Sequence, residues 1–234
     1  MASQYTHDFY AHRHKATVHS SETVLALVMD RIPSVRSAVD IGCGVGTWLS
    51  ALRRRGVLDV QGYDGPWVER DLLVIPQGCF AQVELSKEIP KVTRRYDLAI
   101  SLEVAEHLPA SSAKEFVSFL TELSDTVLFS AAIPGQGGTG HVNEQWQSYW
   151  IDLFAGQAYG AHDCIRPSIW DDVNIPYWYR QNTLLFVKGK TNGETFPLDM
   201  VHPELYGSYA QPGVKGSFKI LCGAVSSYIR RAVA

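Results

Sequence analysis

Apolar positions along the chain occur either in short, nearly continuous runs or at helical spacing. The short runs predict strands over residues 37–41, 57–63, 78–82, 95–101, 126–131 and 183–188. Apolar residues three or four positions apart predict helices over residues 20–31, 47–55, 111–123 and about 143–157. Ser20 or Ser21 can cap the first of these helices. Strands that alternate with helices indicate βαβ units, and therefore an α/β fold with a doubly wound, largely parallel sheet.

The same pattern divides the chain into three parts. Residues 1–34 are predicted to form an N-terminal helical cap, residues 35–190 the main domain, and residues 191–234 a C-terminal extension. The extension ends in a segment, 214–233, whose apolar residues and basic ends predict an amphipathic helix. We expect this helix to pack on the domain or on a second subunit of a homodimer, with peripheral membrane contact as the alternative.

Composition and charge narrow the class of protein. The 234 residues are 46% hydrophobic and 19% charged, which fits one α/β domain with a small appendage. The net charge of −3 provides no general basic field, which argues against a nucleic-acid partner. The four cysteines form no C-x-x-C pair, and the N-terminal residues lack the apolar segment of a signal peptide. We therefore expect reduced thiols and a cytoplasmic protein.

A glycine-rich turn follows the first predicted strand and leads into a helix. Glycine lets the backbone approach a ligand that a Cβ would repel, and the first helical N–H groups point toward that ligand. The glycines follow the pattern G-x-G-x-G, and Thr47 stands where a hydride-transfer enzyme needs glycine or alanine. The turn predicts a nucleotide-cofactor site that comprises Asp40, Gly42, Cys43, Gly44 and Gly46.

Asp64 follows the second predicted strand. An acid at this position in a nucleotide-binding sheet accepts hydrogen bonds from ribose hydroxyls, and its two oxygens suit two vicinal hydroxyls. The alternative is an Asp in a surface turn before Gly65 and Pro66. The distance of Asp64 from the glycine turn along the sequence favours the ribose role.

These features, in this order, resemble the class I S-adenosylmethionine-dependent methyltransferases. The glycine turn is similar to motif I of that family, and Tyr96–Glu103 resembles its fourth-strand motif. The resemblance implies a Rossmann-like, seven-stranded, mostly parallel sheet with an antiparallel late strand. It also implies an enzyme that binds S-adenosylmethionine, with Glu84 and Leu85 near the adenine and Glu103 at the cofactor; Glu84 departs from the usual Asp.

Two glutamates and a histidine, Glu103, Glu106 and His107, follow the fourth strand. The E-x-x-E-H pattern resembles the metal-dependent O-methyltransferases of ubiquinone biosynthesis and of small-RNA 2′-O-methylation. The resemblance implies a Mg²⁺ or Mn²⁺ site that His141 completes as a second histidine. The alternative is a metal-free site in which His107 or His141 acts as the general base.

The acceptor is expected to enter beside the loop after the fifth strand. Asn143, Gln145 and Trp146 follow His141 there, and helix capping is the alternative for Asn143. A later segment rich in aromatic residues contains Trp178 and Tyr179. These residues predict contacts with a sugar-like acceptor or a lid over the cofactor, and the alternative is an aromatic seal at the edge of the sheet. The N-terminal histidines, which include His14, are predicted to lie on a solvated helix.

The leading hypothesis is O-methylation of a small hydroxylated molecule: a sugar, a glycan end or a natural product. One alternative is a methyltransferase that acts on the ribose 2′-hydroxyl of RNA, which requires a basic groove beside His141. The other is a protein that binds the cofactor without catalysis, which would not need the histidines and glutamates together.

Overall fold

The computed structural model describes residues 7–32, 34–189 and 199–210. The chain divides into two compact units, residues 1–200 and 201–234. The described part of the second unit contains helix α7, Pro203–Ala210. The helix predicted over residues 214–233, on which the membrane contact depends, lies outside the described residues. The predicted boundaries at residues 34 and 190 stay predictions.

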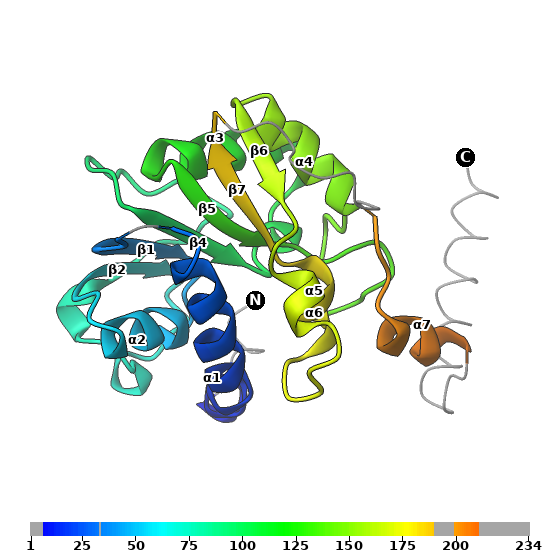
Figure 1. The fold of residues 1–234 in the computed structure, drawn as a ribbon. Helices are drawn as coiled ribbons and strands as arrows, with labels where there is room; N and C mark the ends of the chain where they lie inside the picture. The colour runs from blue at the N-terminus through cyan, green and yellow to red at the C-terminus, as the bar shows by residue number, and fades with distance from the viewer. Residues whose placement is uncertain (1–6, 33, 190–198, 211–234) are drawn as a thin grey trace, which may run out of the picture. The chain divides into compact units, whose positions relative to one another are not determined.

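The first unit is built on one seven-stranded sheet with the strand order β3-β2-β1-β4-β5-β7-β6 (Figure 1). The strands are β1 Ser37–Ile41, β2 Asp59–Asp64, β3 Phe80–Gln82, β4 Leu98–Leu102, β5 Thr126–Ser130, β6 Tyr159–His162 and β7 Leu184–Lys188. Neighbouring strands from β3 to β5 are parallel, whereas β7 is antiparallel to β5 and to β6. The predicted fold, a mostly parallel sheet of seven strands with an antiparallel late strand, is confirmed.

Helices cover both faces of this sheet (Figure 1). They are α1 His7–Met29, α2 Thr47–Arg54, α3 Ala113–Leu123, α4 Gln147–Ala155, α5 Arg166–Ile169 and α6 Tyr177–Asn182. Helices α1 and α2 lie on one face, and α3 and α4 lie on the other. Leu98 and Ile100 of β4 belong to the core beneath α1 and α2, and Ala99 between them belongs to the core beneath α3. Since side chains alternate across a strand, a strand buried on both faces needs an unbroken apolar run.

Helix α1 starts well before the predicted residue 20. Ser20 and Ser21 are therefore fully buried inside the helix, and the Ser21 hydroxyl donates to the carbonyl of Val18. The prediction that either serine caps this helix is wrong, because the polar residues that precede them are also helical. No helix in the described part of the chain is long and apolar enough to cross a bilayer.

Candidate active site

The carboxyl ends of β1, β2, β4 and β5 meet at one edge of the sheet, where a cavity of about 440 Å³ opens. In an open parallel sheet this edge is where ligands bind. Asp64, Glu103 and the loop after β5 line this cavity. So do four of the five predicted glycine-turn residues, and Gly46 does not: Asp40, Gly42, Cys43 and Gly44. The sheet therefore brings together segments that are separated by up to about a hundred residues in the chain.

The glycine turn has the backbone conformation that its sequence predicts. Gly42 and Gly46 have φ angles of +83° and +87°, in the left-handed region that favours glycine. A Cβ on Gly42 would collide with the side chain of Val104, and a Cβ on Gly46 would lie 2.8 Å from Ile75. These two glycines are required both by the conformation and by the space around them.

Asp64 is fixed by protein donors on both of its oxygens. Its Oδ2 accepts from the N–H of Gly44 at 2.7 Å, and its Oδ1 accepts from the N–H of Gly65 at 2.6 Å and from Nε1 of Trp67 at 3.0 Å. Burial raises the pKa of Asp64, and these hydrogen bonds act in the opposite direction. The carboxylate thus ties the end of β2 to the glycine turn at the wall of the cavity, and its contact with a ribose stays a prediction.

Asp40 is the other buried acid of this turn. It is 2% exposed, and its Oδ2 has no hydrogen-bond partner among the described residues. Burial raises the pKa of Asp40 well above its usual range, and the nearby charge of Asp64 raises it further. A cationic group of a ligand would therefore be stabilised here.

Glu103 has a left-handed backbone, with φ of +56°, and its carboxylate is part of a buried amide network. Its Oε2 accepts from Nε2 of Gln136 at 2.7 Å, and its Oε1 accepts from Nδ2 of Asn182 at 3.1 Å. Gln181 also donates to Oε1 of Gln136 at 3.1 Å. This network joins the ends of β4 and α6 to the loop after β5.

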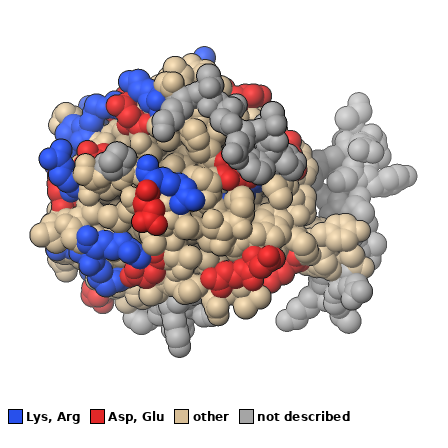
Figure 2. Space-filling model, in the orientation of Figure 1, with Lys and Arg blue, Asp and Glu red and all other residues tan. Residues whose placement is uncertain are grey.

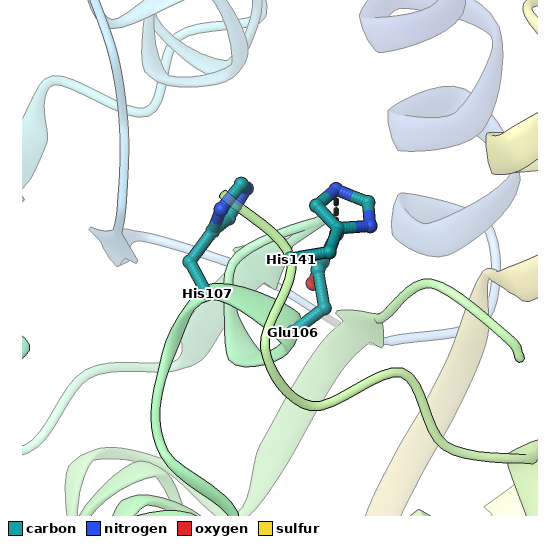
Figure 3. Close-up of side chains that lie close together, drawn as sticks. All are labelled: Glu106, His107 and His141. Carbon is teal, nitrogen blue, oxygen red and sulfur yellow. Dashed lines mark ion pairs between the residues drawn. The ribbon is translucent and has the colours of Figure 1, made fainter. Parts of the chain in front are cut away.

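Glu106, His107 and His141 form a compact cluster (Figure 3). The first two lie on the short 3₁₀ turn η4, Ala105–His107, and His141 comes from the loop after β5. Their potential ligand atoms lie within 4.8 Å of one another. The imidazole centroids are 4.8 Å apart in an edge-to-face arrangement, and Nε2 of His141 lies 3.9 Å from Oε1 of Glu106, which is fully buried.

The cluster contains three of the four predicted metal ligands. Glu103 does not join it, because its carboxylate is directed to Gln136 and Asn182 instead. The predicted four-residue metal set is therefore corrected to three residues. One carboxylate and two imidazoles are a donor set that divalent transition metals accept.

Two of the predicted acceptor residues line the cavity and three do not. Trp178 and the buried Tyr179 line it, and Tyr179 packs edge-on against Trp48 with centroids 5.4 Å apart. The other three lie outside the set of lining residues: Asn143, Gln145 and Trp146. Asn143 is buried and accepts from Gln145, whereas Trp146 is 39% exposed, so their contacts with an acceptor remain predictions.

Leu85 lines the cavity and Glu84 does not, and the contact of Leu85 with the adenine stays a prediction. Glu84 pairs with Lys87 at 2.8 Å, and this partner lowers its pKa. Trp67, which no sequence pattern singled out, also lines the cavity, and the prediction that His14 lies on a solvated helix is corrected, because His14 lines the cavity too. His14 bonds to Thr47 at 2.8 Å, and burial, followed by the charge of Arg54, lowers the pKa of its imidazole.

The chain matches a known protein family over more than half of its length. A family model described as a methyltransferase domain matches residues 10–166. The chain belongs to this family, and its fold and glycine turn make it a class I S-adenosylmethionine-dependent methyltransferase. A search of curated proteins finds no significant match.

Solved structures show the same fold. One is magnesium protoporphyrin IX methyltransferase from Synechocystis PCC 6803 with bound S-adenosylhomocysteine: 20% identity, 75% of this chain and 83% of that chain covered, TM-score 0.51. Another is an O-methyltransferase family protein from Burkholderia thailandensis: 17% identity, 82% and 63% covered, TM-score 0.53. A third is the methyltransferase domain of bacterial CtHen1-C: 18% identity, 75% and 100% covered, TM-score 0.52.

Proposed function

We propose that this methyltransferase transfers a methyl group to a hydroxyl oxygen of a small acceptor, such as a sugar, a glycan end or a natural product. The observation that carries the proposal is the cluster of Glu106, His107 and His141 in the wall of the cavity that the glycine turn also lines. A hydroxyl is a poor nucleophile until its proton is removed, and imidazole is the side chain best suited to accept it near neutral pH.

The residues of the chain divide the work between the two ends of the cavity. The glycine turn, Asp40 and Asp64 bind and orient the methyl donor, and Trp178 and Tyr179 exclude water from the acceptor side. S-adenosylmethionine, when bound, supplies a methyl group on an activated sulfonium. The S–CH₃ bond breaks and an O–CH₃ bond forms, while the hydroxyl proton passes to Nε2 of His141, or to His107 in the alternative arrangement.

A divalent metal fits the same cluster. Glu106, His107 and His141 would hold it, and the metal would lower the pKa of an acceptor hydroxyl. The three donors leave further coordination positions for water or acceptor oxygens. Two imidazoles beside one carboxylate favour Mn²⁺ or another transition metal over Mg²⁺.

The charge of the protein supports a small acceptor over RNA. On the face shown in Figure 2, Lys and Arg side chains lie next to Asp and Glu side chains. Together with the net charge of −3, this gives little of the basic surface that phosphate backbones require. A cytoplasmic location remains our expectation.

The test uses S-adenosylmethionine with an isotopically labelled methyl group, offered with sugars, glycans, phenolic natural products and RNA oligonucleotides. We expect label on a hydroxyl oxygen of a small acceptor, and we expect His141→Ala to lower kcat by about 10²- to 10⁴-fold. His19→Ala, a change at a half-exposed histidine that pairs with Asp172, is the matched control. Label on an RNA ribose, or on nitrogen or carbon, would contradict the proposal; EDTA followed by Mn²⁺ tests the metal separately.

A further inference from the structure

Glu144, three residues after His141, holds one edge of the His141 ring. Its Oε1 lies 2.9 Å from Nδ1 of His141. The same oxygen accepts from the N–H of Gly137 at 2.7 Å, and Oε2 accepts from the N–H of Gly135 at 2.8 Å. Three contacts therefore hold the carboxylate of Glu144, which does not itself line the cavity.

These contacts determine which ring nitrogen of His141 carries the proton. A carboxylate that already accepts two backbone N–H groups acts as an acceptor toward His141 as well, so Nδ1 must be the donor. In a neutral imidazole, Nε2 is then the acceptor. The atom left with a lone pair is the one that lies 3.9 Å from Glu106, inside the cluster with His107.

The loop before His141 is shaped for the same arrangement. Gly135, Gly137 and Gly140 have φ angles of +89°, +68° and +77°, so the loop turns back on itself at positions that favour glycine. A Cβ on Gly138 would collide with Nε2 of His141. Glycine at position 138 therefore keeps the reactive edge of the ring uncovered, while Glu144 holds the opposite edge.

We propose that Glu144 is a positioning residue that fixes the orientation and tautomer of His141, so that Nε2 faces the reacting groups. The inference rests on the proposed function in one respect only, namely that Nε2 of His141 accepts the hydroxyl proton or binds a metal.

The first test reads the tautomer directly. Long-range ¹H–¹⁵N NMR of histidine-labelled protein, recorded well above pH ~6.5 so that imidazoles are neutral, distinguishes the two forms. His141→Asn identifies the His141 signals. We expect wild-type His141 to be protonated at Nδ1, and we expect Glu144→Ala, which removes the acceptor of Nδ1, to convert most of it to the Nε2-protonated form. An Nε2-protonated His141 in the wild-type protein would overturn the proposal.

The second test measures turnover. We expect Glu144→Ala to lower kcat by about 10- to 100-fold, with little change in KM for S-adenosylmethionine. Glu115→Ala makes the same change at an exposed glutamate on α3 and should leave kcat unaltered. Gly138→Ala should lower kcat comparably, because it covers Nε2 without touching Glu144.

Failure of the proposed function and failure of the positioning role of Glu144 would give different results. A wild-type protein with Nδ1-protonated His141 but no transfer to any hydroxyl acceptor would refute the proposed function and leave the role of Glu144 in holding the ring intact. Full turnover in Glu144→Ala, with a melting temperature equal to that of wild type, would refute the positioning role alone.

Discussion

At the scale of single residues, the acids at the strand ends determine how the cofactor site behaves. Asp64 is satisfied by three protein donors, whereas Oδ2 of Asp40 has no partner among the described residues. Burial raises the pKa of both groups, and the charge of Asp64 acts further on Asp40. The fold alone therefore stabilises the ionised form of Asp40 poorly, and a cationic ligand would supply the missing interaction.

We therefore predict a pH-dependent effect of Asp40→Asn. Since the pKa of Asp40 is raised in the folded protein, its contribution to stability is fully present below the unfolded value, near 3.8, and is lost as pH rises through the higher folded pKa. Asn is neutral throughout, so the melting temperature of the wild type should fall relative to the variant as pH increases over this window. Thermal melts from about pH 4 upward check this.

The same variant should bind S-adenosylmethionine more weakly. A hydrogen bond to a charged group contributes about 1.5–3 kcal/mol, which corresponds to roughly 10- to 100-fold in affinity. Isothermal titration calorimetry measures the affinity of each protein for S-adenosylmethionine. A difference in melting temperature between the two proteins that does not change with pH, together with equal affinities for S-adenosylmethionine, would contradict this account of Asp40.

At the scale of elements, the sequence predicts those helices, strands and turns whose position depends on a local pattern of residues. The glycine turn and the acids after β1, β2 and β4 mark strand ends, and these positions agree with the structure because backbone conformation and burial dictate them. Strand β6, Tyr159–His162, has no comparable signal: it is four residues long and contains a glycine, and its pairing with β7 makes it a strand. Helix α6 was not predicted either, because its six residues are too few to show a helical pattern.

The side chains of the site are harder to predict than the elements that carry them. The contact of His14 with Thr47 joins residues 33 positions apart, so no local spacing reveals it. The place of Asn143 follows from its backbone N–H, which donates at 3.0 Å to the carbonyl of Glu106, 37 residues earlier in the chain. Glu103 could be placed after β4 from sequence, but its amide partner Asn182 is 79 residues away.

The amide network around Glu103 gives a prediction at this scale. Asn182 is 2% exposed and donates to Glu103 at 3.1 Å and to Gln136 at 2.8 Å. Asn182→Ala removes one bond from the buried Glu103 and one from the half-buried Gln136, so we expect a loss of about 2–4 kcal/mol in the free energy of unfolding. Asn174→Ala, at an exposed asparagine that bonds to Asp172, is the control and should cost less than about 1 kcal/mol. Urea denaturation measures both, and equal losses would contradict a structural role for the network.

At the scale of the whole molecule, the described site belongs to one unit. The residues that line the cavity lie between His14 and Tyr179, all within the unit of residues 1–200. Helix α1 belongs to this unit as well and supplies His14 and Thr17 to the cavity wall. The N-terminal helix is therefore part of the site as well as a cover for the sheet.

We predict that a chain that ends at Met200 binds S-adenosylhomocysteine as the full chain does, because the cavity-lining residues all precede residue 180. A ligand at one hundred times its Kd stabilises the folded state by about 2.7 kcal/mol, and this increment should be the same in both chains. Thermal melts with and without ligand, and calorimetric Kd values within about twofold, are the measurements. Thr47→Val, which removes the hydroxyl that bonds to His14 at the cavity wall, should weaken binding equally in both and serves as the control. A truncated chain that folds but binds S-adenosylhomocysteine much more weakly would show that residues 201–234 contribute to ligand binding.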